Sequence, residues 1–313
     1  MERKHLILAA VLILALIIAP HFLYTVFVIK FLCFALFASA FNLLLGYGGL
    51  LSFGHAAYFG SAAYVTAHSM KYWGVTPEIG VILGALTAAF LGVVFGWLAI
   101  RRSGIYFAMI TLAFAQMVYF LALQMPFTGG EDGIQAVPRG ELFGLISLRP
   151  DMALYYFVLV LCVGGFYVVY RTINSPFGQI MKAIKENPDR ATSLGYQVSH
   201  FKLAAFVIST TISGVAGALT SLTFQLASLT NVHWSMSGEV VLMTLIGGMG
   251  TLIGPIVGAG VVVTLQTYLA PFGAWLTIIL GTIFVVCVLL FRRGIIGELW
   301  HRGLLPGFPS RRT

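Results

Sequence analysis

Few residues of this chain are of the types that carry chemistry, and one histidine is distinctive among them. The sequence holds 10 acidic residues, 7 histidines and 3 cysteines among 313 residues. His55 lies in the segment GYGGLLSFGHAAYFGSAAYV, residues 46–65, where it could relay a proton or contact a ligand. A histidine at the start of a helix more often hydrogen-bonds to neighbouring backbone, so both interpretations stay open.

The motifs of common enzyme classes are absent from the sequence. There is no GxxxxGK[ST] phosphate loop, no HExxH zinc motif and no GxSxG nucleophile motif. GGMG, residues 247–250, lacks the preceding strand and the following acid of a dinucleotide fingerprint. TGGEDG, residues 128–133, resembles a fragment of a calcium loop without its later ligands, and we interpret it as a turn. We therefore predict no catalytic residue, no metal site and no cofactor.

The composition indicates which kind of element must position any functional residue. Hydrophobic residues make up 59% of the chain and charged residues only 9%, with a mean hydropathy of +0.95, whereas soluble domains carry roughly 25% charged residues. We predict an all-α polytopic membrane protein. Cys33, Cys162 and Cys287 lie in apolar runs without CxxC spacing, which predicts buried free thiols.

We expect about ten transmembrane helices, because about 20 apolar residues suffice to cross a bilayer. The first predicted helix comes after a basic start and resembles a signal peptide, but it lacks a clear cleavage site and is expected to be retained. The predicted spans lie near residues 6–20, 23–45, 54–71, 77–100, 104–124, 152–170, 202–226, 238–249, 254–270 and 272–291.

The distribution of charge predicts the orientation of these spans. With the N-terminus in the cytoplasm, most of the 18 lysines and arginines fall on cytoplasmic segments, as the positive-inside rule requires. The C-terminus is then cytoplasmic as well. Membrane topology explains the net charge of +8, and we expect no nucleic-acid partner.

The order of the spans predicts one transmembrane domain, residues 1–313, that contains an inverted repeat. Residues 22–124 and 202–291 form two half-repeats of opposite orientation, separated by a cytoplasmic loop at 171–200. Each half contains a helix broken by glycines, at GYGGLLSFGH (46–55) and at GGMGTLIGP (247–255).

The broken helices predict a translocation pathway. Backbone that leaves the helix at membrane depth is tolerated only where protein buries it or a watery cavity touches it. Ser52 is expected to cap the helix after the first break, and Pro255 to begin the helix after the second. Alternatively, the glycines only allow close helix packing, as GxxxG pairs such as Gly80/Gly84 do. The pathway candidates, with Glu239 expected at the outer mouth, are Asn42, Gly48, Gly49, Ser52, His55, Gln116, Gln225, Glu239, Gly248 and Gly250.

The cytoplasmic loop is predicted to form a hairpin of two short helices. Ser175 and Asn187 are each followed by proline, which is typical of helix caps, and Gly195 fits the stop of the second helix. One apolar stripe at helical spacing consists of Phe177, Ile180, Met181 and Ile184. The stripe could lie against the chain's own span ends or in the groove of a partner, and periodicity alone leaves both open.

Five segments carry a resemblance to a known family. They are GYGGLLSFGHAAYFGSAAY, GIYFAMITLAFAQ (104–116), TGGEDG, SPFGQIMKAIKENPDRATSLG and GGMGTLIGPIVGA, and they extend from about residue 40 to 260. In this order they resemble the membrane permeases of branched-chain amino acid ABC importers, specifically the LivM-type subunit. The resemblance implies the type II ABC importer fold and a place in the bacterial cytoplasmic (inner) membrane.

The resemblance also implies partners and a solute. The partners are a second, related permease subunit, two cytoplasmic ATP-binding subunits and an external substrate-binding protein, and the solutes are branched-chain or related small amino acids. A passive channel or secondary transporter for a small neutral solute, such as urea or a short amide, is the alternative. The loop matches an EAA-x3-G pattern only at Ala191 and Gly195. Its implied ATPase-coupling residues are Ser175, Pro176, Phe177, Gly178, Ile180, Met181, Ile184, Arg190, Ala191 and Gly195.

Overall fold

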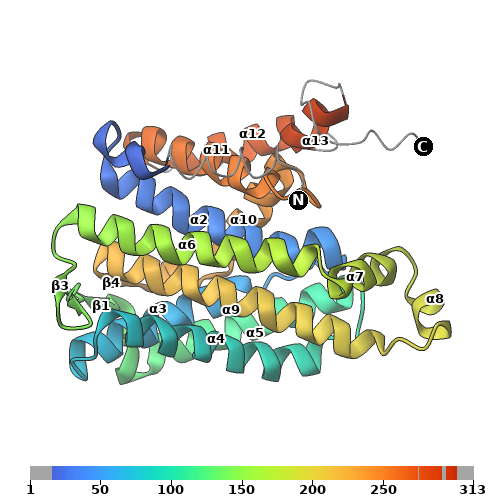
Figure 1. Ribbon diagram of the computed structural model, residues 1–313, viewed down its shortest axis with the longest axis horizontal. Coiled ribbons are helices and arrows are strands. Elements are labelled where there is room, and N and C mark those ends of the chain that lie inside the picture. Colours follow the sequence, from blue (N-terminus) through green and yellow to red (C-terminus); the bar gives the residue numbers. More distant parts are fainter. Residues whose placement is uncertain (1–15, 274, 291–293, 302–313) are drawn as a thin grey trace.

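Helices run side by side along most of the molecule (Figure 1). The computed structural model describes residues 16–273, 275–290 and 294–301. Residues 6–15 of the predicted first span, 6–20, therefore lie outside the described residues. Basic residues 292, 293, 302, 311 and 312, which supported the cytoplasmic C-terminus, lie outside them too.

The described chain forms the following helices in order. They are α2 (Thr25–Asn42), α3 (His55–Tyr72), α4 (Pro77–Ala99), α5 (Ile105–Gln124), α6 (Asp151–Ile173), α7 (Pro176–Glu186), α8 (Pro188–Ser193), α9 (Val198–Phe224), α10 (Trp234–Gly247), α11 (Gly254–Leu269), α12 (Trp275–Leu290) and α13 (Gly294–His301). A π-helix, η2 (Leu43–Tyr47), extends α2. Short 3-10 turns occupy Ala19–His21, Pro126–Thr128, Gly130–Asp132, Leu229–Asn231 and Ala270–Phe272.

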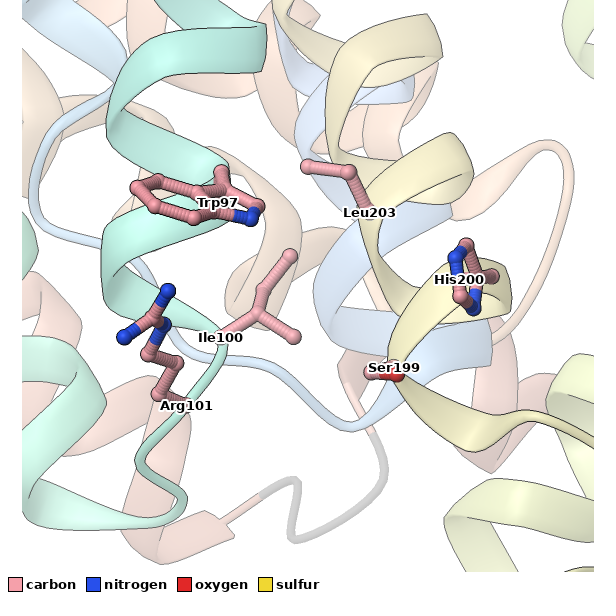
Figure 2. Close-up of a pocket in the computed structure, with 6 residues that line it drawn as sticks. All are labelled: Trp97, Ile100, Arg101, Ser199, His200 and Leu203. Carbon is pink, nitrogen blue, oxygen red and sulfur yellow. The ribbon is translucent and has the colours of Figure 1, made fainter.

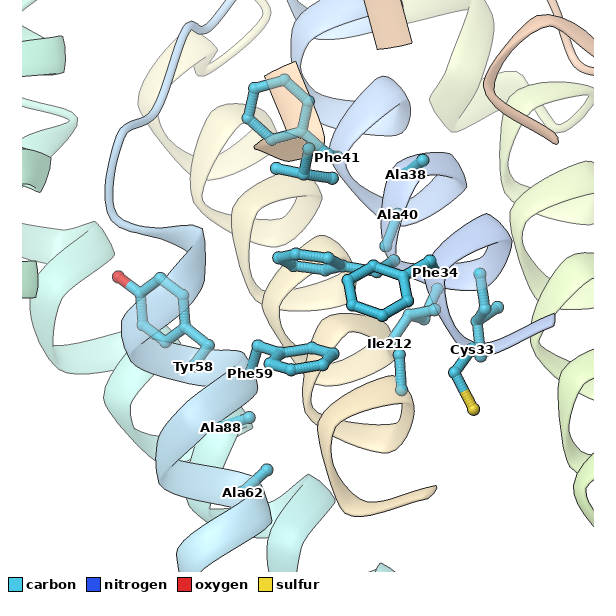
Figure 3. Close-up of a cluster of buried hydrophobic side chains, with 14 of the residues drawn as sticks. Cys33, Phe34, Ala38, Ala40, Phe41, Tyr58, Phe59, Ala62, Ala88 and Ile212 are labelled. Carbon is cyan, nitrogen blue, oxygen red and sulfur yellow. The ribbon is translucent and has the colours of Figure 1, made fainter. Parts of the chain in front are cut away.

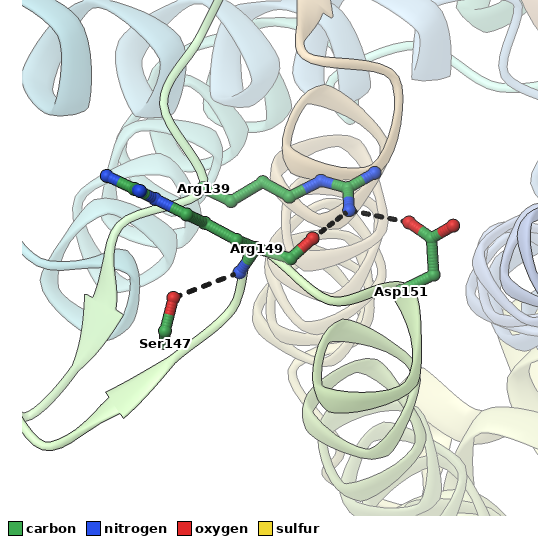
Figure 4. Close-up of polar contacts among 4 residues, drawn as sticks. All are labelled: Arg139, Ser147, Arg149 and Asp151. Carbon is green, nitrogen blue, oxygen red and sulfur yellow. Dashed lines mark hydrogen bonds and ion pairs between the residues drawn. The ribbon is translucent and has the colours of Figure 1, made fainter.

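In the described chain, four two-residue strands gather at one end of the bundle, which we call the strand end. β1 (Ile134–Gln135) pairs antiparallel with β4 (Leu226–Ala227), so that Ile134 faces Ala227. β2 (Glu141–Leu142) pairs with β3 (Ile146–Ser147) in the same sense. Arg139 fixes the chain after β3, because its guanidinium donates to the Asp151 carboxylate at 2.6 Å and to the Arg149 carbonyl at 2.9 Å (Figure 4).

Helices α7, α8 and α13 lie at the opposite end, which we call the α7 end (Figure 1). Arg101 and Arg102, between α4 and α5, belong to the same end, as do the basic residues of α7 and α8. The basic segments predicted to share the cytoplasmic face are therefore on one end of the described bundle.

Within the described residues, six helices are long and apolar enough to cross a membrane. They are Thr25–Tyr47, Pro77–Ala99, Ile105–Gln124, Asp151–Ile173, Val198–Phe224 and Gly254–Phe272. Helices α3, α10 and α12 run alongside them but are not among these six. The prediction of a helical, polytopic membrane protein is confirmed, whereas the count of about ten spans stays a prediction.

Helix α2 lies at the centre of the bundle. Its most apolar stretch is 83% buried, and it packs against α6, α9, α10 and α11. Phe34 and Phe37 of α2 meet Phe59 of α3 in the core, with ring centres 6.1 and 4.6 Å from that of Phe59. Figure 3 shows Phe34 and Phe59 in this cluster. A buried central helix explains why α2 shows apolar residues on every side rather than one stripe.

Glycines bring α4 close to its neighbours. A side chain on Gly84 would meet Thr66 of α3 at 2.5 Å, and one on Gly96 would meet Phe206 of α9 at 2.8 Å. These contacts confirm close helix packing as one use of the GxxxG pairs.

Candidate functional site

The first chain break begins inside η2 at the α7 end of α2. After Tyr47 the chain leaves the helix, and Gly49 adopts a φ of +68°, which favours glycine. The amides of Gly49 and Leu50 donate back to the carbonyls of Leu45 and Leu44 at 3.1 and 3.2 Å. The break is thus the unwound end of a helix, and its Gly49 and Leu50 amides keep hydrogen-bond partners within that helix end.

The second chain break, between α10 and α11, lies directly against the first. Gly248 and Gly250 adopt φ values of +118° and +78°. The Asn42 side chain links the two breaks, because its Nδ2 donates to the Thr251 carbonyl and its Oδ1 accepts from the Gly250 amide, both at 2.8 Å. A side chain on Gly46 would meet the Gly250 nitrogen at 2.5 Å, so the backbones also touch. Pro255 occupies the first turn of α11, as predicted.

The loop between α6 and α9 forms the predicted helical hairpin. Ser175 caps α7 by accepting from the Gly178 amide at 3.3 Å, and Asn187 caps α8 by accepting from the Arg190 amide at 3.0 Å. Gly195 adopts a φ of +88° after α8. These observations confirm the predicted caps and the predicted stop. They were predictable because each depends on residues only a few positions apart.

Helix α7 rests on the first chain break. The Lys185 ammonium donates to the Gly46 carbonyl at 2.6 Å, and the Met181 methyl lies 3.0 Å from where a Gly48 side chain would begin. The Lys182 ammonium lies 5.5 Å from the centre of the Tyr47 ring. The hairpin therefore touches the break through both apolar and charged contacts.

The apolar stripe of α7 faces the chain itself. Met181 and Ile184 are each only 2% exposed, and Phe177 stacks on Phe201 of α9 with ring centres 5.7 Å apart. Of the two interpretations left open by periodicity, the structure places the stripe against the chain's own helix ends. The exposed side of the hairpin is α8 and the turn after it, where Leu194 is 71% exposed.

The start of α3 corrects the predicted role of Ser52. The residue that caps α3 is Gly54, and the Ser52 hydroxyl accepts only from the Gly54 amide at 3.2 Å. Hydroxyls from other helices satisfy the neighbouring amides: Thr111 accepts from Phe53 at 3.1 Å, and Ser237 accepts from Ala56 at 2.9 Å. Tertiary partners replace the local cap because the start of α3 is buried against α5 and α10.

His55 lies in the core between α2, α3 and α9. It is fully buried, and its Nε2 lies 2.9 Å from the Ser209 hydroxyl. Since that hydroxyl donates to the Ala40 carbonyl at 2.6 Å, Nε2 carries the proton and donates to Ser209. The chain Ala40–Ser209–His55 ties α2, α9 and α3 together, with the ring of Phe41 packed edge-on against the imidazole.

The comparisons with known proteins decide the family. The family described as "Branched-chain amino acid transport system / permease component" matches residues 23–291 of this chain. The chain belongs to this permease family. No solved structure matches it significantly.

Individual relatives of this permease cover most of its length. The high-affinity branched-chain amino acid transport system permease protein LivM of Escherichia coli is 27% identical over 278 residues, which cover 82% of this chain and 65% of the relative. LivM of Salmonella typhimurium is 26% identical over the same length and coverage. The ribose import permease protein RbsC of Bacillus subtilis is 25% identical over 236 residues, 70% of each chain. The permease thus spans 65% of the length of both LivM relatives.

Glu239 of this permease belongs to a polar cluster formed by side chains of α2, α10 and α11. Its carboxylate accepts from the Gln266 amide of α11 at 2.9 Å, and the Lys30 ammonium of α2 lies close enough to attract it electrostatically. All three side chains are half-buried. Each lies within about two turns of the strand end of its helix.

The remaining pathway candidates of the permease do not join one site. Gln116 is half-buried on α5, whereas Gln225 is exposed at the end of α9, where it has a φ of +54° and its carbonyl accepts from Val137 at 3.0 Å. Gly48 and Gly248 are buried in the two breaks, and Gly49 and Gly250 are exposed there.

Two further predictions concern sites outside the pathway. TGGEDG forms turns in which Gly129, Gly130 and Gly133 have positive φ, and no group of metal-ligating side chains occurs within the described residues. Cys33 and Cys162 are buried free thiols, as predicted. The side chain of Cys287 lies outside the part of the chain that the structure describes.

Sequence reasoning missed three residues that the permease brings into contact with candidates. Lys185 reaches Gly46, Ser209 holds His55, and Lys30 faces Glu239. Only Lys30 carried a signal, because a lysine inside a predicted span is costly without a partner.

Proposed function

We propose that this chain is the transmembrane permease subunit of an ATP-driven importer for branched-chain or related small amino acids. Its match to a family of branched-chain amino acid permease components over residues 23–291 is the observation that carries the proposal. The chain performs no covalent chemistry. Two cytoplasmic ATP-binding subunits hydrolyse ATP, a second, related permease completes the membrane part, and an external binding protein delivers the solute.

The α7–α8 hairpin supports the coupling part of this proposal. Its inner stripe fixes the hairpin to the permease, so the outer face of α8 with Leu194 and Arg190 is free to dock on an ATPase. Movement of the ATPase would then be transmitted through Lys185 and Met181 to the break at Gly46–Gly48. This division leaves the proposed ATPase contact to α8 and Leu194, and it gives the apolar stripe the role of holding the hairpin in place.

The two breaks form the inner part of the proposed pathway. Asn42 holds them together, and a shift of η2 against residues 248–251 would open or close the α7 end beside the exposed Gly49 and Gly250. The inverted repeat over 22–124 and 202–291 within one permease domain is proposed from the order of the spans alone, because the first break precedes the second helix of its half and the second break follows it. With the α7 end in the cytoplasm, the strand end faces the binding protein.

The polar cluster supports an amino acid as the solute. A zwitterion carries an ammonium, which Glu239 could attract, and a carboxylate, which Lys30 could attract. An uncharged sugar has no charged group for either side chain to attract. Charged side chains half-exposed within spans are costly against lipid, so this face is expected to meet water or the second permease. The importer's solute would therefore pass Lys30, Glu239 and Gln266 before it reaches the breaks.

The coupling assignment is tested by two leucine variants, one of them a matched control. Leu194→Asp on the exposed outer side of the hairpin should release the ATPase during purification. Leu145→Asp, at an 87% exposed leucine of the strand end, should leave the ATPase bound. Full ATPase retention by Leu194→Asp would contradict the assignment of the hairpin.

The transport class is tested by uptake into liposomes. With binding protein outside and ATPase subunits assembled, labelled leucine should accumulate only when the ATPases are supplied with ATP, and Glu239→Gln should raise the KM for leucine. Leucine or urea uptake by the permease alone under a solute gradient, without ATP, would support a passive channel instead. Equal uptake of ribose and leucine would remove the amino acid assignment but keep the importer.

A further inference from the structure

A small cavity opens at the α7 end between the last turn of α4 and the first turn of α9. Its volume is about 240 Å³, and its lining residues are Trp97, Ile100, Arg101, Ser199, His200 and Leu203. Figure 2 shows Trp97 and Arg101 on the α4 side of this space, across from Ser199, His200 and Leu203 on α9. None of the lining residues is acidic.

The Arg101 guanidinium gives the cavity a positive charge, and this group is accessible to a ligand. The Arg101 guanidinium lies 4.2 Å from the centre of the Trp97 ring, an arrangement that holds the cation over the indole. Among the described residues no hydrogen bond or ion pair occupies this guanidinium, which is exposed like its neighbour Arg102. The positive end of the 27-residue helix α9 begins at the same cavity, at Val198.

The cavity lies at the ends of two candidate membrane spans, where the boundary between lipid tails and headgroups is expected. Both α4 and α9 are helices long and apolar enough to cross a membrane, and the cavity sits where the first ends and the second begins. Trp97 is 57% exposed, as tryptophans of the membrane interface are. The depth is independent of which end of the bundle faces the cytoplasm.

An exposed apolar stripe leads along α4 to the cavity. Phe90, Val94 and Trp97 are all exposed, and with Arg101 they succeed one another at helical spacing on one face. A ligand that lay on this face would meet three apolar side chains and then a guanidinium. An apolar stripe that ends at a guanidinium matches one phospholipid molecule, whose acyl chain would lie on the stripe and whose phosphate would lie at Arg101.

We propose that this cavity binds the headgroup of an anionic phospholipid, whose phosphodiester pairs with Arg101 and whose acyl chain lies along Phe90, Val94 and Trp97. Arg101 supplies donors in the fork geometry that suits phosphate oxygens. Ser199 and the first amides of α9 add neutral donors. The continuous apolar stripe favours a lipid over a free phosphate ester, which has no tail to cover it.

Native mass spectrometry of the purified, detergent-solubilised permease tests the proposal. Phosphatidylglycerol and phosphatidylcholine of identical acyl chains are titrated separately, and we expect the anionic lipid to bind preferentially. Arg101→Gln should weaken phosphatidylglycerol binding about tenfold, the effect of about 1.4 kcal/mol from a lost charged hydrogen bond. Arg149→Gln, which makes the same charge change on an exposed arginine at the strand end, should leave it unchanged.

A second readout locates the acyl chain. Phosphatidylglycerol brominated on its chains should quench part of the tryptophan fluorescence, and Trp97→Phe should remove that quenched part. The proposal is overturned if both lipids bind alike, if Arg101→Gln leaves the preference intact, or if glycerol phosphate binds as tightly as the whole lipid. Loss of ATPase binding in Arg101→Gln with unchanged lipid binding would assign the cavity to the partner protein instead.

Discussion

Substitution of Asn42 tests whether the two chain breaks are held as one unit. Its amide is 1% exposed and makes two hydrogen bonds of 2.8 Å, one to each of two backbone groups of the second break. A hydrogen bond contributes a net 0.5–1.5 kcal/mol, so Asn42→Ala should lower the free energy of unfolding by about 1–3 kcal/mol. The estimate counts both bonds and assumes that water replaces neither.

Chemical denaturation of the solubilised permease measures this change. The matched control is Asn174→Ala, which removes an exposed amide that donates to the Tyr170 carbonyl at 2.9 Å, and it should cost less than about 0.5 kcal/mol.

Asn42→Asp sharpens the test. An ionised carboxylate can still accept from the Gly250 amide, but it would repel the Thr251 carbonyl. A protonated carboxyl can donate to that carbonyl, so acidic buffer should restore part of the lost stability to Asn42→Asp and none to Asn42→Ala. If Asn42→Ala denatures like the unaltered permease and both variants respond to pH alike, the two breaks are not joined by this residue.

Two further substitutions test the contacts around the breaks. Lys185→Met keeps the length of the side chain but loses the bond to the Gly46 carbonyl, so solute transported per ATP hydrolysed should fall severalfold while the ATPase stays bound; an unchanged ratio would show that this lysine does not transmit movement. Gly217→Ala would place a methyl group against a backbone carbonyl of α3 and should sharply reduce the yield of folded permease in size-exclusion chromatography. Gly164→Ala, at a glycine of α6 with nothing within 4 Å, is its control, and equal yields would contradict the packing argument.

Local chemistry made the hairpin predictable. The Ser175 and Asn187 side chains each accept a hydrogen bond from the amide three residues later. Each cap is therefore encoded within its own four consecutive residues. The spans were equally predictable, because a helix that crosses a bilayer needs apolar residues along its whole length. Pro255 at the start of α11 belongs to the same local class.

Long-range contacts were not predictable from the same sequence. Lys185 and Gly46 are 139 positions apart, and Asn42 and Gly250 are 208 apart, so no local pattern joins them. The α7 stripe was correctly recognised as apolar, but periodicity cannot name the surface that covers it. Ser52 had the right type for a cap, yet hydroxyls of Thr111 and Ser237 satisfied the amides instead.

The surroundings of the breaks match one of the two alternatives that were expected for unwound backbone. Unwound backbone was expected to survive through protein burial or through a watery cavity. Around the first break the protein supplies most partners, since hydroxyls, an amide and a lysine meet its backbone groups. Both breaks lie near the α7 end, where the hairpin can act on them.

The central position of α2 has a consequence for how the protein is made. This helix is synthesised early, yet the helices that enclose it include α9, α10 and α11, which come more than 150 residues later. During synthesis, lipids or insertion factors must therefore cover α2 until α9, α10 and α11 have left the ribosome. The enclosure of α2 is therefore completed only after α11 has been made, and truncation before α11 should leave α2 open to quality-control proteases.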